Sequence, residues 1–232
     1  MSKNLNPQDV AAVVIEIQLG EGGYIPASPN FIQYLREICD KHGILLIFDE
    51  VQTGFGRTGK MFGAEHVDVE PDMVTLAKGI GGGFPLAAVV GQKAIMDSIH
   101  DAGIGSTFGA SPVSCAAALG VFEAFDNENI LSNALMQEKV MKSNLNIAME
   151  KHNFIGDVRG YGPMIGVEIV ENKKSKNPDK LKTNDIINKC KDNGLLLVSC
   201  GKEGNVIRFM GPLTTPLNHV EEAMEIFNKS LN

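Results

Sequence analysis

The stretch that decides the fold reads I-L-L-I-F-D-E and runs from Ile44 to Glu50. Its first five residues are apolar and mostly branched, which is typical of a central parallel strand that is buried on both faces. The run ends abruptly in two acids, Asp49 and Glu50. Because ligands of open α/β sheets bind beyond the carboxyl ends of the strands, Asp49 would lie at a candidate site.

Short apolar runs on both sides extend the predicted sheet. The pattern Ser28-Pro29 is typical of a helix start, and Gly43 of a helix end, so a helix precedes the central strand. A strand, a helix and a second strand in succession predict a right-handed βαβ unit. The further strands predicted for this sheet span residues 11–17, 72–77 and 86–90.

Lys78 follows one of these runs directly, on the loop between two predicted strands. An acid and a lysine that both follow strands of one sheet make a candidate site. The structural alternative is that Asp49 caps a turn and Lys78 is solvated, since both are common after buried strands. Strand spacing by itself leaves both interpretations open.

A rise in polarity near residues 126–129 separates two predicted domains, residues 1–127 and 128–232. A long amphipathic helix, from about Ile130 to His152, would open the second domain. Its strands are expected near residues 158, 164–170, 195–199 and 206–209, with helices at 181–193 and 216–230; helices at 92–102 and 112–125 are expected in the first domain.

Composition excludes several functional classes. The formal net charge of -7 and the lack of a basic stripe argue against nucleic acid as a partner. No apolar run reaches membrane-spanning length, and the N-terminal residues lack the apolar core of a signal peptide, so we expect a cytoplasmic protein. The four cysteines show neither C-x-x-C pairing nor metal-ligand spacing, so we expect free thiols and no metal site.

Two glycine-rich motifs resemble the signature of the class III (ω-type) aminotransferases, which use pyridoxal phosphate. They read D-E-V-Q-T-G-F-G-R-T-G-K at residues 49–60 and T-L-A-K-G-I-G-G-G-F-P-L at residues 75–86. The resemblance is nearest to the enzymes of this family that act on 4-aminobutyrate, and it spans nearly the whole chain. Three more motifs match in the family's order: E-I-Q-L-G-E-G-G at 16–23, G-S-T-F-G-A-S-P-V-S-C-A-A-A-L at 105–119 and V-I-R-F-M-G-P-L-T-T at 206–215.

The resemblance implies a fold and a set of cofactor contacts. The fold would be that of the fold-type-I pyridoxal-phosphate transferases, with part of a large α/β domain and a small α+β C-terminal domain. Lys78 matches the lysine that forms the Schiff base, Asp49 the partner of the ring nitrogen, and Gln52 the partner of the ring hydroxyl oxygen. Thr107, beside the hydroxyl of Ser106, matches a phosphate contact from the neighbouring subunit, which implies a homodimer with shared sites.

The resemblance also implies substrate contacts. Arg208 matches the arginine that clamps a substrate carboxylate, and Glu21 the glutamate that pairs with it and can swing away. Their presence favours an ω-amino donor of the 4-aminobutyrate type, with 2-oxoglutarate as the acceptor. Glu16 would be a supporting acid of the site. The structural alternatives are an Arg208 at a strand edge or end that pairs with a local acid, and a Glu16 that is buried against a structural partner.

The resemblance covers only the C-terminal part of the family's chain. The family's preceding strands, its small-residue phosphate loop and the aromatic residue that stacks on the pyridine ring have no counterpart here. The first motif also departs from the family pattern, with Ile17 and Leu19 replacing a proline and a glutamine. Two alternatives therefore stay open. One is an acetylornithine- or ornithine-type aminotransferase, or an aminomutase, of the same fold; the other is a truncated, non-catalytic chain that associates with a full-length partner.

Overall fold

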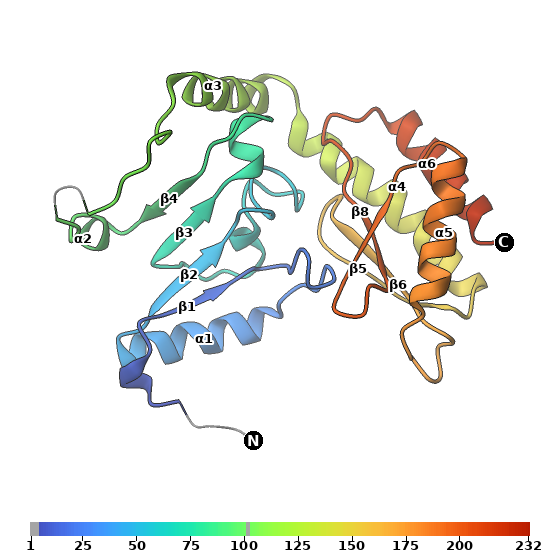
Figure 1. The fold of residues 1–232 in the computed structure, drawn as a ribbon, viewed down its shortest axis with the longest axis horizontal. Coiled ribbons are helices and arrows are strands. Elements are labelled where there is room, and N and C mark those ends of the chain that lie inside the picture. Colours follow the sequence, from blue (N-terminus) through green and yellow to red (C-terminus); the bar gives the residue numbers. More distant parts are fainter. Residues whose placement is uncertain (1–4, 101–102) are drawn as a thin grey trace. The chain divides into compact units, whose positions relative to one another are not determined.

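The computed structural model describes residues 5–100 and 103–232, and these residues form two compact units. Each unit has its own sheet and its own core (Figure 1). Unit 1 is built from described residues within Met1–Ile17, Ala27–Phe55 and Phe62–Glu128, and unit 2 from Gln18–Pro26, Gly56–Met61 and Asn129–Asn232.

Unit 1 contains a four-stranded mixed sheet in the order β1-β2-β3-β4. The first three strands are parallel, and β4 pairs antiparallel with β3. This confirms the predicted α/β class with a mixed sheet. The strands are β1 (Ala12–Ile15), β2 (Leu45–Asp49), β3 (Met73–Leu76) and β4 (Ala88–Gly91).

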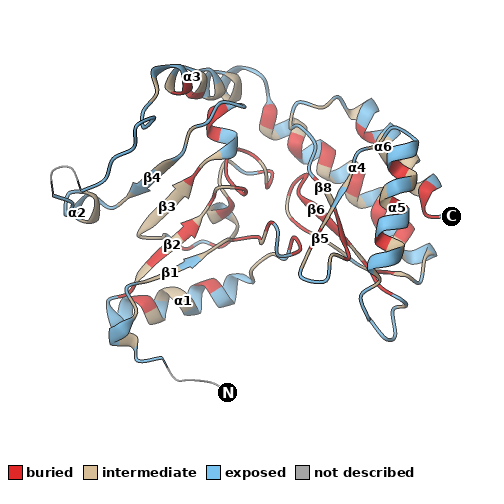
Figure 2. Cartoon of the chain, in the orientation of Figure 1, coloured by how far each residue is buried: buried red, intermediate tan, exposed pale blue. Residues whose placement is uncertain are grey.

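Helix α1 (Pro29–His42) begins and ends where the sequence predicts. The Ser28 hydroxyl accepts a hydrogen bond from the Phe31 N–H at 3.3 Å, and Gly43 closes the helix with a left-handed φ of 67°. The helix buries one face of the sheet, where Leu46 and Phe48 of β2 are fully buried (Figure 2). Alternate side chains of β2 therefore belong to the core that α1 covers.

The prediction of a helix over residues 92–102 was wrong for most of the described part of that range. Helix α2 spans only Lys93–Met96, and residues 101–102 lie outside the described residues. The hydroxyl of Ser98 donates to the Ile95 carbonyl at 2.6 Å, a local bond that competes with helix continuation. The next helix, α3 (Pro112–Asn127), agrees with its prediction. Two 3-10 turns, η2 (Gly63–His66) and η3 (Lys78–Gly81), complete the part of unit 1 that flanks β3.

Unit 2 is an antiparallel sheet in the order β5-β6-β8-β7, with a helical layer packed against it (Figure 1). Its core contains Leu145, Ile165, Ile207 and Phe227, all fully buried. The predicted elements are present. They are α4 (Ile130–Lys151), β5 (Ile155–Arg159), β6 (Ile165–Ile169), α5 (Lys180–Asp192), β7 (Val198–Cys200), β8 (Val206–Phe209) and α6 (Leu217–Ser230).

Two short segments from the N-terminal half, 18–26 and 56–61, belong to unit 2. The buried amide of Gln18 donates to the Met164 carbonyl at 2.9 Å and accepts from the Tyr161 N–H at 2.8 Å. At Gly162 a Cβ atom would lie 2.3 Å from the carbonyl carbon of Thr58, so only glycine permits this approach. A single boundary between residues 127 and 128 does not describe these two segments.

Candidate active site

The parallel strands of unit 1 bring three candidate residues to one edge of the sheet. Glu16 directly follows β1, Asp49 ends β2, and Lys78 comes two residues after the end of β3. The register pairs Asp49 with Thr75 of β3, so the carboxylate and the lysine leave neighbouring strands at the same end. This is the edge at which open α/β sheets bind ligands.

The Asp49 carboxylate is partly buried and only partly occupied. Its Oδ1 accepts a hydrogen bond from the Val51 N–H at 3.0 Å. Within the described parts of the chain, no residue donates to its Oδ2. A carboxylate whose position is set by the backbone, and which keeps a spare acceptor, suits a cationic N–H donor.

The neighbouring acid, Glu50, is almost fully buried and has every acceptor engaged by nearby groups. Its Oε2 accepts from the Thr53 hydroxyl and from the Gly63 N–H at 2.9 Å, and its Oε1 accepts from the Ala64 N–H at 2.6 Å. The glutamate thereby ties residues 50–54 to the start of η2. Gln52, which lies in this turn, is buried as well. The sequence marked Glu50 only as the second of two acids, because its backbone donors lie 13 and 14 residues further along the chain.

Lys78 has a strained backbone and an exposed side chain. Its φ of 46° is left-handed, a conformation that costs a non-glycine residue about 1–2 kcal/mol. The next residue, Gly79, packs so closely against Phe55 that a Cβ atom on it would lie 2.8 Å from the Phe55 Cβ. No residue in 5–100 or 103–232 forms a hydrogen bond or an ion pair with the Lys78 ammonium. Such strain persists only where the surrounding structure holds the residue in place.

Ser106 and Thr107 lie in an exposed turn ahead of α3. The Ser106 carbonyl accepts from the Gly109 N–H at 3.0 Å, which closes the turn. No interaction joins either hydroxyl to Asp49, Gln52 or Lys78 within the described chain. The structure brings Asp49 and Lys78 to the same end of neighbouring strands in unit 1.

In unit 2, Glu21 and Arg208 form an ion pair although 187 residues separate them. The Arg208 side chain is 18% exposed and that of Glu21 is 73% exposed. Arg208 lies near the end of β8, an inner strand, and its acid partner is distant in the sequence and not local. Its Nε is buried, and none of the described residues accepts from it. Burial opposes the charge, but the bond to Glu21 leaves the pKa of Arg208 raised.

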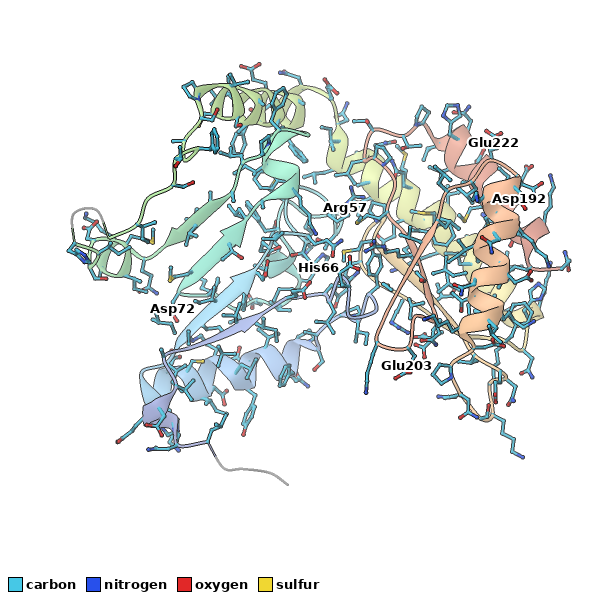
Figure 3. All side chains as sticks on the ribbon, in the orientation of Figure 1. Arg57, His66, Asp72, Asp192, Glu203 and Glu222 are labelled. Carbon is cyan, nitrogen blue, oxygen red and sulfur yellow. The ribbon has the colours of Figure 1, made fainter. Side chains whose placement is uncertain are left out.

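A phenol and a thiol beside this pair stay uncharged. Burial raises the pKa of Tyr24 to about 12 and that of the Cys200 thiol to about 11, so neither ionises near neutral pH. The Tyr24 hydroxyl donates to the Met210 sulfur at 3.2 Å. Arg57, labelled in Figure 3, donates to the Gly211 carbonyl at 2.7 Å, and burial lowers its pKa. The sequence predicted no role for Tyr24 or Arg57, because their neighbours are far away in the chain.

The family model described as aminotransferase class-III matches residues 1–231. The chain belongs to the class III aminotransferases. It is 45% identical over 223 residues to the 4-aminobutyrate aminotransferase of Escherichia coli, covering 96% of this chain and 52% of that protein. It is 44% identical to the 5-aminovalerate aminotransferase of Pseudomonas aeruginosa and 39% identical to the acetylornithine aminotransferase of Clostridium acetobutylicum. Each match covers 95% of this chain, and 52% and 54% of those proteins.

Solved aminotransferase structures have the same fold. An aminotransferase of Bacillus anthracis superposes with a TM-score of 0.89 at 32% identity, over 95% of this chain and 52% of that one. The ornithine aminotransferase of Toxoplasma gondii gives 0.87 at 32% identity, over 97% and 52%. The chain therefore spans about half the length of the relatives it matches. The family match and these superpositions confirm the predicted family and fold. Class III aminotransferases depend on pyridoxal phosphate.

The donor set at the sheet edge of unit 1 fits a class III cofactor. Pyridoxal phosphate has an aldehyde, a basic ring nitrogen and a ring oxygen, which suit an amine, a carboxylate and an amide. Lys78, Asp49 and Gln52 would supply these three groups: Asp49 and Lys78 leave neighbouring strands at the same end, and Gln52 lies in the turn that follows Asp49. Of the residues described, no three His, Cys, Asp or Glu side chains lie close enough to hold a metal ion. Likewise, none of the helices described is long and apolar enough to cross a bilayer.

Proposed function

We propose that this chain carries catalytic and substrate-binding residues of an ω-amino acid aminotransferase with pyridoxal 5'-phosphate as its cofactor. The reaction would move the amino group of a 4-aminobutyrate-like donor to 2-oxoglutarate. The single observation that carries this choice is the Glu21–Arg208 ion pair. Its arginine can take a carboxylate, and its glutamate can cover that arginine when the substrate has none to offer there.

Lys78 is proposed as the lysine that holds the cofactor and moves the proton. An amine does both only while it is not committed to an ion pair, and Lys78 meets this condition among the residues described. When bound, pyridoxal phosphate supplies an electron sink for the negative charge that develops on the substrate carbon. The Lys78 Nζ would take the proton from that carbon and deliver it to the C4′ carbon of the cofactor, and it would move a proton in the opposite direction in the second half-reaction.

Asp49 is proposed to hold the ring nitrogen protonated, because its backbone-oriented carboxylate keeps Oδ2 available. Gln52 would donate to the ring oxygen from a turn that the Glu50 carboxylate fixes. Thr107, with Ser106 beside it, would bind the phosphate group of a partner subunit's cofactor, which makes a homodimer part of the proposal. Glu16 would add a further carboxylate at the sheet edge.

The Glu21–Arg208 pair would discriminate between substrates. Exposed ion pairs contribute only about 0–1 kcal/mol, so a carboxylate that binds Arg208 bidentately can displace Glu21. With Glu21 in place the arginine is neutralised, and an ω-amino donor meets no unpaired cation there. The α-carboxylate of 2-oxoglutarate would take the place of Glu21 in the second half-reaction.

The wider assignments belong to the same proposal. Residues 1–127 would be the C-terminal portion of the cofactor-binding domain and residues 128–232 the small domain, in a cytoplasmic protein. An acetylornithine-type reaction is the second candidate, because a relative of that kind is 39% identical over 222 residues. The third is that this chain is not catalytic by itself and associates with a partner that supplies the rest of the family's length.

The first experiment is an absorbance spectrum of the chain with added pyridoxal phosphate, followed by borohydride reduction and peptide mass spectrometry. We expect a visible band in the wild-type chain and cofactor mass on the peptide that contains Lys78. Lys78→Arg is the matched control, and it should lose both signals while it stays folded. Label on another lysine would overturn the assignment of Lys78. A folded chain without a band would favour the third candidate.

A donor panel then separates the first two candidates. It compares 4-aminobutyrate, 5-aminovalerate and acetylornithine, each with 2-oxoglutarate, and follows glutamate formation. The proposal expects the two unsubstituted ω-amino acids to be preferred. Preference for acetylornithine would select the second candidate instead.

A further inference from the structure

We infer that Arg159 is a positioning residue for Glu21, and that it thereby controls how readily Arg208 accepts a substrate carboxylate. The inference rests on the proposed role of the Glu21–Arg208 pair. It adds Arg159 as a residue that affects which substrates this pair admits. Arg159 ends β5 and lies outside every motif that the sequence pointed to.

Arg159 attaches the backbone next to Glu21 to the sheet of unit 2. Its Nε and Nη2 both donate to the Gly23 carbonyl, at 3.0 and 2.8 Å. Its Nη1 donates to Asp157 at 3.0 Å and to Glu168 of the neighbouring strand β6. The Arg159 side chain is only 14% exposed. The two acids therefore orient the guanidinium so that its Nε and Nη2 groups both face the Gly23 carbonyl.

A second contact fixes the same loop at Glu21 itself. The Gly201 N–H donates to the Glu21 carbonyl at 2.9 Å. Gly23 and Gly201 have left-handed φ values of 114° and 85°, and a Cβ on Gly23 would lie 3.4 Å from the Gly201 Cα. Upstream, the amide of Gln18 bonds at both of its ends. The backbone is thus held on each side of Glu21, while its side chain is 73% exposed.

The backbone of Glu21 is therefore fixed, while its side chain can change its rotamer. The Glu21 carboxylate competes with a substrate carboxylate for Arg208, and an intramolecular competitor acts through its effective concentration. That concentration is high only while the loop stays where Arg159 and Gly201 hold it. Removing the Gly23 contact would let the loop move away, so Arg208 would become more available.

The test measures the dissociation constant of glutarate, a five-carbon dicarboxylate that has no oxo group to react. Binding to the 232-residue chain is followed by NMR titration at fixed pH and salt, with the Gly201 amide as a reporter. Because an exposed ion pair contributes little net free energy, we expect Glu21→Gln to tighten glutarate binding about twofold to fivefold. Arg159→Met, which keeps the apolar stem, should tighten it by a similar factor.

The double variant decides whether Arg159 acts through Glu21. With Glu21 already replaced, Arg159→Met should bring no further tightening. Asp157→Asn is the matched control, because it removes one acid partner of Arg159 and leaves both bonds to Gly23; its glutarate affinity should stay within a factor of two of wild type. If thermal unfolding shows that Arg159→Met is not folded, Arg159→Lys replaces it. Lysine keeps the positive charge but cannot donate two parallel hydrogen bonds to the Gly23 carbonyl.

The outcomes separate this inference from the proposed function. Tighter binding in Glu21→Gln with no change in Arg159→Met or Arg159→Lys would overturn the role of Arg159. The proposed competition between Glu21 and a substrate carboxylate for Arg208 would still stand. Additive effects in the double variant would overturn it too, because Arg159 would then act independently of Glu21. If Arg208→Met binds glutarate as well as wild type, or if no variant binds it, the proposed function of the pair fails and the inference fails with it.

Discussion

The Glu50 carboxylate and the Gly63 N–H meet at 2.9 Å across 13 residues of glycine-rich chain. With the bonds to Thr53 and Ala64, this contact closes the segment that leaves β2 and returns at η2. Glu50 therefore has a structural role, while among the described residues no donor reaches the Oδ2 of Asp49, the acid before it. The two adjacent carboxylates differ because one is saturated with donors.

We expect Glu50→Gln to destabilise the chain by about 2–3 kcal/mol. The amide that replaces one carboxylate oxygen would face backbone N–H donors, which leaves buried groups unsatisfied. Glu65→Gln is the matched control, because Glu65 lies in the same loop and accepts from the Phe62 N–H at 2.8 Å, but is exposed where Glu50 is buried. Urea unfolding measures both, and equal losses in the two variants would contradict the role of Glu50.

Asp72 should make the stability of unit 1 depend on pH (Figure 3). Burial opposes its ionisation, but the Leu46 N–H at 2.7 Å, Arg36 at 2.9 Å and Gln92 at 3.0 Å hold the pKa of Asp72 below its ordinary value. A group with a lowered folded-state pKa stabilises the protein above its unfolded pKa of about 3.9 and loses this contribution as the pH falls through the folded value.

The variant Asp72→Asn isolates this contribution. We expect it to lose about 2 kcal/mol at pH 7, because the anionic acceptor of the Arg36 and Leu46 hydrogen bonds is replaced by a neutral amide and the ion pair with Arg36 is lost. Between pH 5 and pH 3 its stability should fall less steeply than that of wild type. Thermal unfolding across this range gives both slopes. Parallel slopes would show that other carboxylates account for the acid sensitivity.

Gly160→Ala should be severely destabilising, by about 3 kcal/mol or more. Gly160 has a φ of 126°, and a Cβ atom there would lie 2.0 Å from the Met164 carbonyl oxygen, so backbone would have to move. Gly194→Ala separates the steric clash from conformational strain, since Gly194 has a φ of 93° and nothing within 4 Å. It should lose only about 1 kcal/mol. A similar midpoint of urea unfolding for the two variants would refute the steric argument.

Lys78→Gly should stabilise the cofactor-free chain while it removes the amine. Glycine adopts the φ of 46° without strain, and the relief exceeds the added entropy of the unfolded chain by about 0.5 kcal/mol. Lys78→Arg keeps the strained backbone and should match wild-type stability. Loss of stability in Lys78→Gly, measured by thermal unfolding without cofactor, would mean that the lysine side chain supports the fold.

Local patterns in the sequence determined most of the secondary structure and the sheet edge at which the proposed cofactor residues Asp49 and Lys78 lie. The cap at Ser28, the glycine at position 43 and the apolar run that ends at Asp49 each act within a few residues, so the chain itself reports them. Parallel pairing of β1 to β3 then places Asp49 and Lys78 at one end without further information. The exception was the helix predicted at 92–102, where a local side-chain bond ends the helix early.

Only the tertiary structure decided how distant residues combine. Glu21 meets Arg208 across 187 residues, and Arg159 reaches Gly23 across 136, in bonds that no periodicity or local propensity encodes. The same holds for segments 18–26 and 56–61, which belong to unit 2 because a buried amide and a close glycine contact attach them there. Sequence patterns describe what each stretch prefers locally, whereas these contacts depend on which surfaces the folded chain brings together.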